Sequence, residues 1–175
     1  MVRQGKVLYI GLSNYSPERT KKAAAILEDL GVHCLVHQPR FNMLDQEVKQ
    51  NGLFQVLEEA GMGAAVYSPL AQGLLSGKYN NGVPKDSRAA GPSIYFTQDN
   101  LKPELLEKVR KLSAISERRG QTMPQLALSW ILNHPVIASV IIGASRVSQI
   151  DDNIDALKNL SFSEEELREI DQILA

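Results

Sequence analysis

The chain has 175 residues, of which 43% are hydrophobic and 22% are charged, and its formal net charge is −1. This is the composition of a globular domain with a sizeable core, and the near-zero charge argues against nucleic acid as a partner. No apolar run approaches the ~18 residues of a membrane helix or the core of a signal peptide. We therefore expect one cytoplasmic domain over residues 1–175, without membrane insertion. The single cysteine, Cys34, excludes an intrachain disulfide.

Short apolar runs alternate with helical patterns along the chain. Runs typical of strands occupy residues 6–10, 33–37, 63–67 and 136–142. Ser16 and Pro17 suit the start of a first helix, and Gly31 suits its end. Further helical patterns lie at 53–60, 103–119 and 123–133, from about 146, and after 163, where Ser163 and Glu166 form a capping box.

The order of these elements predicts an α/β fold with a parallel sheet. The strands are short and apolar without alternation, as expected when both faces are covered. Four β-α units are an awkward number: an eight-stranded barrel needs eight, and a four-stranded open sheet would need helices on both faces in a doubly wound order. The pattern alone does not choose between these two architectures. Residues 67–101 form a long polar stretch for a compact domain, which indicates function.

Polar residues follow every predicted strand, at the end where both architectures bind ligands. Ser13 and Asn14 follow the first strand, and Gln38 ends the second. The third leads into "YSPLAQGLLSGKY", which offers a tyrosine ring, backbone N–H groups and Lys78 for an anion. The fourth leads into "GASR" at a helix start, where N–H groups and Arg146 could hold a phosphate.

Each of these features also has an ordinary explanation as a turn, a cap or a surface charge. Their common position on one rim is what favours a binding site. No G-x-G-x-x-G follows a strand and no G-x-S-x-G is present. The three histidines lack partners at the spacing of metal ligands, so no metal site is expected.

The motifs "GKVLYIGLSNYS", "VHQPRFNML", "AVYSPLAQGLLSGKY", "SRA" and "VIIGASRVSQIDDN" together resemble the aldo-keto reductases. The resemblance covers the whole chain and is nearest to the branch of potassium-channel beta subunits and bacterial glyceraldehyde-phosphate-type reductases. It implies a (β/α)8 barrel of the TIM type that binds NADP(H) across the carboxyl rim. This chain would supply about strands 5–8 and their helices.

The resemblance also implies residue roles. Ser13, Asn14 and Gln38 would hold the nicotinamide carboxamide, and Tyr67 would stack on the ring. The remaining cofactor residues would be Ser68, Pro69, Leu70, Gln72, Lys78 and Arg88 at the pyrophosphate, Gly143, Ser145, Arg146 and Gln149 at the 2′-phosphoribose, and Asp152 and Asn153 at the adenine. Many relatives have Glu where this chain has Asp152.

The catalytic set of the family is absent from this chain. That set is an aspartate, a tyrosine, a lysine and a histidine from the first four barrel strands. None of Tyr9, Tyr15, Tyr67, Tyr79 or Tyr95 has the family's context. The resemblance therefore implies the cofactor-binding half of an NADPH-dependent reductase of small carbonyl compounds. The alternatives are a non-catalytic NADP(H)-binding regulatory module like the channel subunits, and a half-barrel that binds nothing tightly.

Four parallel strands also leave two unpaired edges, at "KVLYI" and "VIASVII". Both are rich in Val and Ile, and only Lys6 guards one of them, so each is a template for another strand. We expect a homo-oligomer, most simply a two-fold dimer that closes an eight-stranded ring, or a complex with a complementary N-terminal half.

Overall fold

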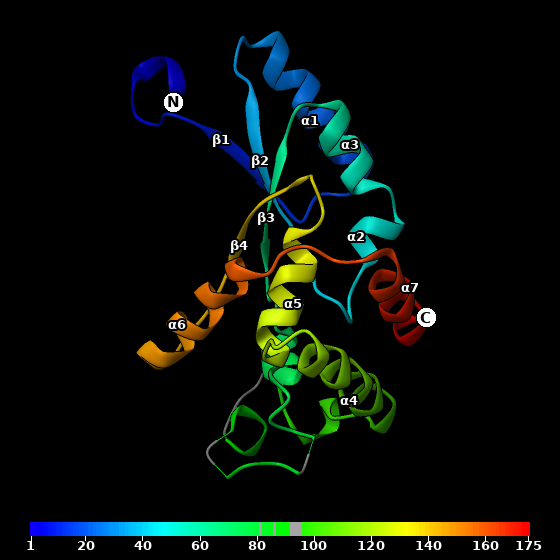
Figure 1. Cartoon of the computed structure of the whole chain (residues 1–175). Helices are drawn as coiled ribbons and strands as arrows, with labels where there is room; N and C mark the ends of the chain where they lie inside the picture. Colours follow the sequence, from blue (N-terminus) through cyan, green and yellow to red (C-terminus); the bar gives the residue numbers. More distant parts are fainter. Residues whose placement is uncertain (81, 86, 92–95) are drawn as a thin grey trace.

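The computed structural model describes residues 1–80, 82–85, 87–91 and 96–175, so Tyr95 lies outside the described residues. Its centre is a parallel sheet of β1 (Ile10–Ser13), β2 (Cys34–Gln38), β3 (Gly63–Tyr67) and β4 (Ile137–Ile141). The strands lie side by side in sequence order, β1-β2-β3-β4 (Figure 1). A doubly wound sheet reverses its order partway. The sequential order is therefore that of a barrel segment and excludes the doubly wound alternative.

The first strand lies later in the sequence than expected. We predicted residues 6–10, whereas β1 spans Ile10–Ser13 and pairs from Ile10 against Cys34. In this register, residues 6–9 extend past the start of β2, so their backbone lies opposite no neighbouring strand. Leu8 and Tyr9 are accordingly 80% and 71% exposed. The other three strands lie within one residue of their expected ends.

The helices agree with the sequence pattern at their starts, because the predicted caps form. Ser16 accepts a hydrogen bond from the Arg19 N–H at 3.3 Å, and Ser163 and Glu166 make a reciprocal capping box. Only the short α2 was not anticipated. The helices are α1 (Pro17–Asp29), α2 (Glu47–Gln50), α3 (Leu53–Glu59), α4 (Pro103–Arg118), α5 (Met123–Leu132), α6 (Val147–Asp155) and α7 (Glu164–Leu174).

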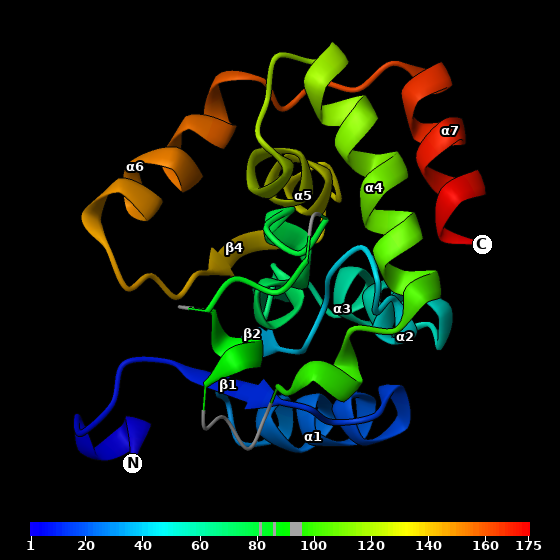
Figure 2. The ribbon, with the colours of Figure 1, turned by 90° about the horizontal axis from the view of Figure 1, so that it is seen from below.

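The core lies between the sheet and the helices on its outer face (Figures 1 and 2). Ala64 and Val66 of β3 point into it and are fully buried, while Ala65 and Tyr67 point to the other face and are only half-buried. Phe41 stacks on Trp130 of α5 with ring centroids 5.4 Å apart. The period-2 alternation of burial in β3 shows that one face of the sheet is covered more than the other.

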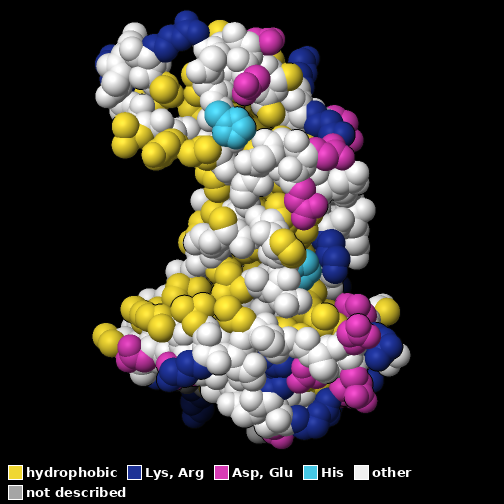
Figure 3. Space-filling model, turned by 45° about the horizontal axis from the view of Figure 1, so that its top comes forward, with side chains coloured by type: hydrophobic (Ala, Val, Ile, Leu, Met, Phe, Trp, Pro, Cys, Tyr) yellow, Lys and Arg dark blue, Asp and Glu magenta, His cyan; other side chains and the backbone are white. Residues whose placement is uncertain are grey.

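The inner face of the sheet is largely uncovered in the described chain. Ile141, which pairs with Tyr67, is 42% exposed there, and Ala65 and Tyr67 are only half-buried. Hydrophobic side chains gather in two areas at the left of Figure 3, with a hollow between them. We had expected both faces of the strands to be covered, and this prediction was wrong for the inner face. No layer of the described chain packs against the apolar residues there. No helix among the described residues is long and apolar enough to span a membrane.

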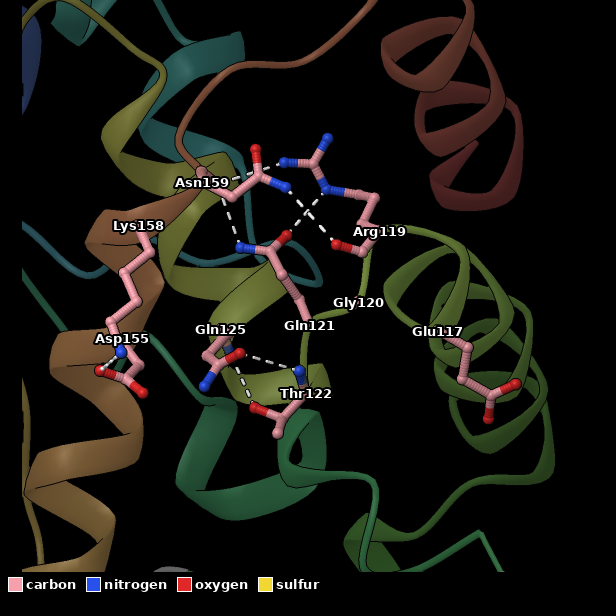
Figure 4. Close-up of a pocket in the computed structure, with 9 residues that line it drawn as sticks. All are labelled: Glu117, Arg119, Gly120, Gln121, Thr122, Gln125, Asp155, Lys158 and Asn159. Atoms are coloured by element: carbon pink, nitrogen blue, oxygen red, sulfur yellow. Dashed lines mark hydrogen bonds and ion pairs between the residues drawn. The ribbon is translucent and has the colours of Figure 1, made fainter.

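A buried arginine joins α4 and α5 to the C-terminal segment (Figure 4). Arg119 is 4% exposed in its side chain and lies 2.8 Å from Glu166. Its guanidinium also donates to the carbonyls of Asn159 and Ser161 and lies over the Phe162 ring at 3.8 Å. Burial alone would raise the pKa of Glu166, but the Ser163 N–H and the Arg119 guanidinium outweigh it and hold the pKa below its usual range.

We predict that Glu166→Gln lowers the free energy of unfolding by about 1 kcal/mol at pH 7, because a charge-assisted bond becomes a neutral one. The folded pKa of Glu166 is depressed, so its contribution is present above the unfolded pKa of about 4.3 and is lost as pH falls through the folded value. Urea unfolding at a series of pH values measures this. Glu164→Gln, an exposed change in the same helical turn, is the control. A deficit that persists unchanged at low pH would contradict the assignment.

Candidate functional site

The ends of β1, β2 and β3 bring four of the predicted site residues together. Ser13 Oγ donates to the Gln38 carbonyl at 2.9 Å, and Asn14 Nδ2 donates to Ser13 Oγ at 3.2 Å. The Tyr67 hydroxyl donates to Asn14 Oδ1 at 3.1 Å. Cross-strand register places Ser13 opposite Gln38, so both reach the rim from neighbouring strands. The result is a connected row of hydroxyl and amide groups at one rim of the sheet.

Backbone strain gathers at the same rim. Four described residues other than glycine have a left-handed φ: Asn14 at 55°, Ser68 at 55°, Ala71 at 46° and Gln72 at 59°. All four follow a strand end, and three lie in the corner after β3 and the η2 turn (Ala71–Ser76). Such conformations cost about 1–3 kcal/mol each and persist only where the surroundings enforce them.

Asn42 enforces the conformation of that corner. It is 3% exposed, and its Nδ2 donates to the Ser68 carbonyl at 3.1 Å while its Oδ1 accepts from the Leu44 N–H at 3.0 Å. The backbone beside it pairs with Tyr67, which donates from its N–H to the Pro39 carbonyl at 3.0 Å. The chain after β2 therefore holds the corner after β3. Sequence reasoning gave Asn42 no role, because its burial comes from packing between distant segments.

A pocket of about 830 Å³ lies between this corner and the turn after β4. It gathers ten of the predicted cofactor residues from segments up to 85 positions apart in the sequence. Ser76, Ser87 and Ile141 also line it, and the sequence did not single them out. The predicted residues in its lining are Ser68, Pro69, Leu70, Gln72, Lys78, Gly143, Ser145, Gln149, Asp152 and Asn153.

Two predicted arginines stand outside that lining. Arg146 is exposed and forms the N-cap of α6, next to Ser145. Arg88 lies in the short η3 turn (Arg88–Ala90), and its side chain lies outside the described part of the structure. The predicted pyrophosphate role of Arg88 therefore stays a prediction.

The turn after β4 is closed by α6 itself. The Gln149 Oε1 accepts from the Ser145 N–H at 2.8 Å and from its hydroxyl at 3.2 Å. The Gln149 side chain thus reaches back over one helical turn and holds Ser145 at the start of α6. Beside it, the N-terminal N–H groups of α6 carry partial positive charge. Together with Lys78 across the pocket, the arrangement suits an anion such as a phosphate.

Asp152 lines the pocket but bonds to α5. Its carboxylate accepts from the Thr122 hydroxyl at 3.2 Å and from Gln125 Nε2 at 2.7 Å. Thr122 and Gln125 are also the two members of the α5 capping box. Asp152 thus joins α6 to the start of α5, a structural role that the sequence pattern did not reveal.

His37 is the buried titratable group beneath this rim. It is fully buried, and its Nε2 accepts from the Tyr15 N–H at 3.3 Å. Burial lowers the pKa of His37, so the imidazole is neutral at pH 7. Its bond fixes the start of the segment between β1 and α1, which carries Asn14.

A second cavity of about 560 Å³ surrounds Arg119 and Gln121 (Figure 4). Three of its charged groups form ion pairs: Arg119 with Glu166, and Lys158 with Asp155 at 2.7 Å. Gln121 donates to the Asn159 carbonyl and to the Ser129 hydroxyl, both at 3.0 Å. These groups serve the packing of the C-terminal helices, and the rim pocket is the better candidate for a ligand.

Comparison with known proteins relates the chain to one enzyme family. A model described as "Aldo/keto reductase family" matches residues 1–175. The chain is 45% identical over 177 residues to the "L-glyceraldehyde 3-phosphate reductase" of Escherichia coli strain K12, covering 99% of this chain and 51% of that protein. It is 35% identical over 179 residues to the "Putative voltage-gated potassium channel subunit beta" of Schizosaccharomyces pombe, covering 99% of this chain and 52% of that protein. The chain thus spans about half the length of the curated relatives it matches.

We predict that Asn42→Ala loosens the corner after β3. It removes the partner of the Ser68 carbonyl and of the Leu44 N–H, which costs about 1–3 kcal/mol of unfolding free energy. Hydrogen exchange should accelerate at residues 68–77 beyond the effect of that global loss. Asn51→Ala is the control, because it removes an asparagine bond to the Leu53 N–H away from the rim. Equal acceleration of 68–77 in both variants would remove Asn42 from this role.

Proposed function

The chain belongs to the aldo-keto reductase family, and we propose that it is the NADP(H)-binding half of a carbonyl reductase of that family. In this proposal its four strands correspond to strands 5–8 of a (β/α)8 barrel, and the whole protein works in the cytoplasm. The sequential parallel order and the length relative to the relatives support that correspondence.

The observation that carries the proposal is the continuity of the rim. The polar row of Ser13, Asn14, Gln38 and Tyr67 adjoins the corner at Ser68, and the pocket continues from there to Ser145. A dinucleotide is an extended molecule with an amide ring at one end and phosphates farther along. The amide and hydroxyl groups lie at one end of this path and Lys78 and Arg146 farther along it, so the donor set fits.

When bound, NADPH supplies the hydride that reduces a carbonyl to an alcohol. Ser13, Asn14 and Gln38 would orient the carboxamide, and the ring of Tyr67 would support the nicotinamide from the inner side of the sheet. Lys78, Ser145 and Arg146 would neutralise phosphate charge. The Asn42 bond and the Gln149 bond would hold these groups in position before the cofactor arrives, which limits the ordering cost of binding.

Protonation of the carbonyl oxygen needs an acid that we do not assign to this chain. Tyr67 donates its hydroxyl proton to Asn14, and the buried Tyr79 hydroxyl has no hydrogen-bond partner among the described residues. Tyr15 packs against Arg19, whose guanidinium carbon lies 4.6 Å from the ring centroid. We therefore assign the acid to a segment equivalent to the half of the relatives that this chain does not match. The substrate in this proposal is a small carbonyl compound. General-acid help of this kind is worth about 10²–10⁴ in rate.

A second candidate is a regulatory module that binds NADP(H) without turnover. The 35% identity to a protein named as a potassium-channel beta subunit favours it. The two candidates predict different activities when the unmatched half of a relative is added to the chain. Adding the N-terminal half of the Escherichia coli reductase should restore aldehyde reduction if the chain is catalytic in origin, and should restore none if it is regulatory.

We predict that Arg146→Ala weakens NADPH binding about ten- to a hundredfold and leaves NADH binding nearly unchanged. A charge-assisted bond to the 2′-phosphate is worth about 1.5–3 kcal/mol, and NADH lacks that phosphate. Titration of both cofactors by fluorescence or calorimetry measures the ratio. Arg110→Ala, an exposed arginine on α4, is the control. An equal loss for both cofactors would refute the role, and no binding of either cofactor to the parent chain would refute the proposed function.

We also predict that the purified chain alone does not reduce aldehydes with NADPH. The reason is that we assign the acid and its supporting residues to the half of the relatives that this chain does not match. The assay follows NADPH absorbance with a range of small aldehydes, in a preparation from a host lacking its own full-length reductase. Turnover of about 1 s⁻¹ or more, typical of enzymes, would show that a proton donor exists within these 175 residues.

A further inference from the structure

The hydroxyl of Ser87 is a buried polar group that the described chain does not satisfy. Ser87 is 6% exposed, its Oγ is shielded from water, and this oxygen has no hydrogen-bond partner among the described residues. The backbone of Ser87 is satisfied, because its N–H donates to the Pro84 carbonyl at 3.0 Å and its carbonyl accepts from the Ala90 N–H at 3.1 Å. The side-chain oxygen is therefore the polar group of this residue that is left without a described partner.

A buried hydroxyl without a partner lowers the stability of a fold, because it gives up its bonds to water and gains none in return. Native proteins keep few such groups, and each one requires an explanation. Ser87 lines the pocket of about 830 Å³ beside the corner after β3. Tyr79 and Asn80 also hold a buried oxygen without a described partner, but neither of them lines that pocket. Of these three residues, Ser87 is the one placed to meet a ligand.

The same pocket holds an ammonium group that is not paired with a described carboxylate. Lys78 lines the pocket, and its Nζ lies 5.2 Å from the centroid of the Tyr79 ring. A Cβ added to Gly73 would lie 3.4 Å from that Nζ, so the ammonium rests against the η2 turn, which also lines the pocket. The acidic residue of the lining, Asp152, gives its carboxylate to the cap of α5. The pocket therefore favours an anion.

The donors of the pocket come from several directions. Ser87 lies just before the η3 turn, Lys78 follows the η2 turn, and Ser145 stands at the start of α6, whose first N–H groups have no partner within the helix. A carboxylate has two oxygens in one plane, whereas a phosphate presents oxygens in several directions. Donors on separate walls therefore suit a phosphate better than a carboxylate.

We propose that Ser87 is a further anion-binding residue of this pocket, and that its hydroxyl donates to a phosphate oxygen whose charge Lys78 neutralises. The inference rests on the proposed function for the source of that phosphate, which is the dinucleotide. A serine side chain has three staggered positions about its Cα–Cβ bond, so the oxygen can turn towards the cavity without a change in the backbone. A bond from a hydroxyl to a charged phosphate oxygen is stronger than one between neutral groups.

The proposal gives Ser87→Ala two effects of opposite sign. In the unliganded chain the substitution removes an unpaired buried oxygen, so the urea midpoint should equal that of the parent or exceed it. In the complex it removes a donor to the phosphate, so the dissociation constants of inorganic pyrophosphate and of NADPH should each rise about tenfold. A hydroxyl with a purely structural role would do the reverse, because its loss would lower the stability and leave binding unchanged.

Ser116→Ala is the matched control. Ser116 is 3% exposed, and its hydroxyl donates to the Ser113 carbonyl at 2.8 Å within α4, outside the lining of the pocket. This variant loses a hydrogen bond that the chain does make, so its urea midpoint should fall while both dissociation constants match those of the parent. Urea unfolding gives the midpoints, and isothermal titration calorimetry at fixed ionic strength gives the dissociation constants.

The outcomes separate this inference from the proposed function. Equal binding of both ligands by the parent and by Ser87→Ala would overturn the role of Ser87 and leave the proposed function standing. Weaker pyrophosphate binding by the variant, with no NADPH binding by either chain, would support the role and refute the proposed function. A fall in the midpoint of Ser87→Ala as large as that of Ser116→Ala would show that the hydroxyl already has a partner, which would overturn the inference. A parent chain that binds neither ligand would overturn both.

Discussion

The parallel pairing of four strands in sequence order is the constraint on which the rest of this structure depends. Because every strand runs the same way, every strand ends at the same rim. Residues as far apart as Ser13, Gln38, Tyr67 and Ser145 therefore share one edge of the domain. No single segment holds enough polar groups for a dinucleotide-sized ligand. The pairing assembles them from four places.

The same pairing leaves the inner face to be covered by something else. Each connection returns over the outer face, so the helices gather there and bury Ala64 and Val66. Ala65 and Ile141, on the inner face, have no such layer among the described residues. One geometric fact thus accounts for two features of the described chain, a polar rim open on its inner side and end strands, β1 and β4, whose outer edges pair with no described strand. A layer that closes the ring would cover both.

The rim is held by bonds that come from outside it. Asn42 supports Ser68 from the chain after β2, and Gln149 supports Ser145 from within α6. Asp152 ties α6 to the cap of α5, and Arg119 ties the end of α4 to α7 and to the segment before it. These groups would keep a strained corner in place, which is the usual condition for left-handed residues at a binding site.

The sequence by itself determined the α/β class, the parallel sheet, most helix limits and the strand-end motifs, because these depend on local periodicity, caps and turn residues. Ser16 and Ser163 cap their helices by contacts within four residues. Only the tertiary structure decided where β1 begins, since a strand exists only opposite a neighbour, and residues 6–9 have none. It alone decided the sequential strand order, the support of Ser68 by Asn42 and the bonding of Asp152 to α5. These depend on contacts between residues 24 or more positions apart, whose energy comes from burial and pairing that no local pattern records.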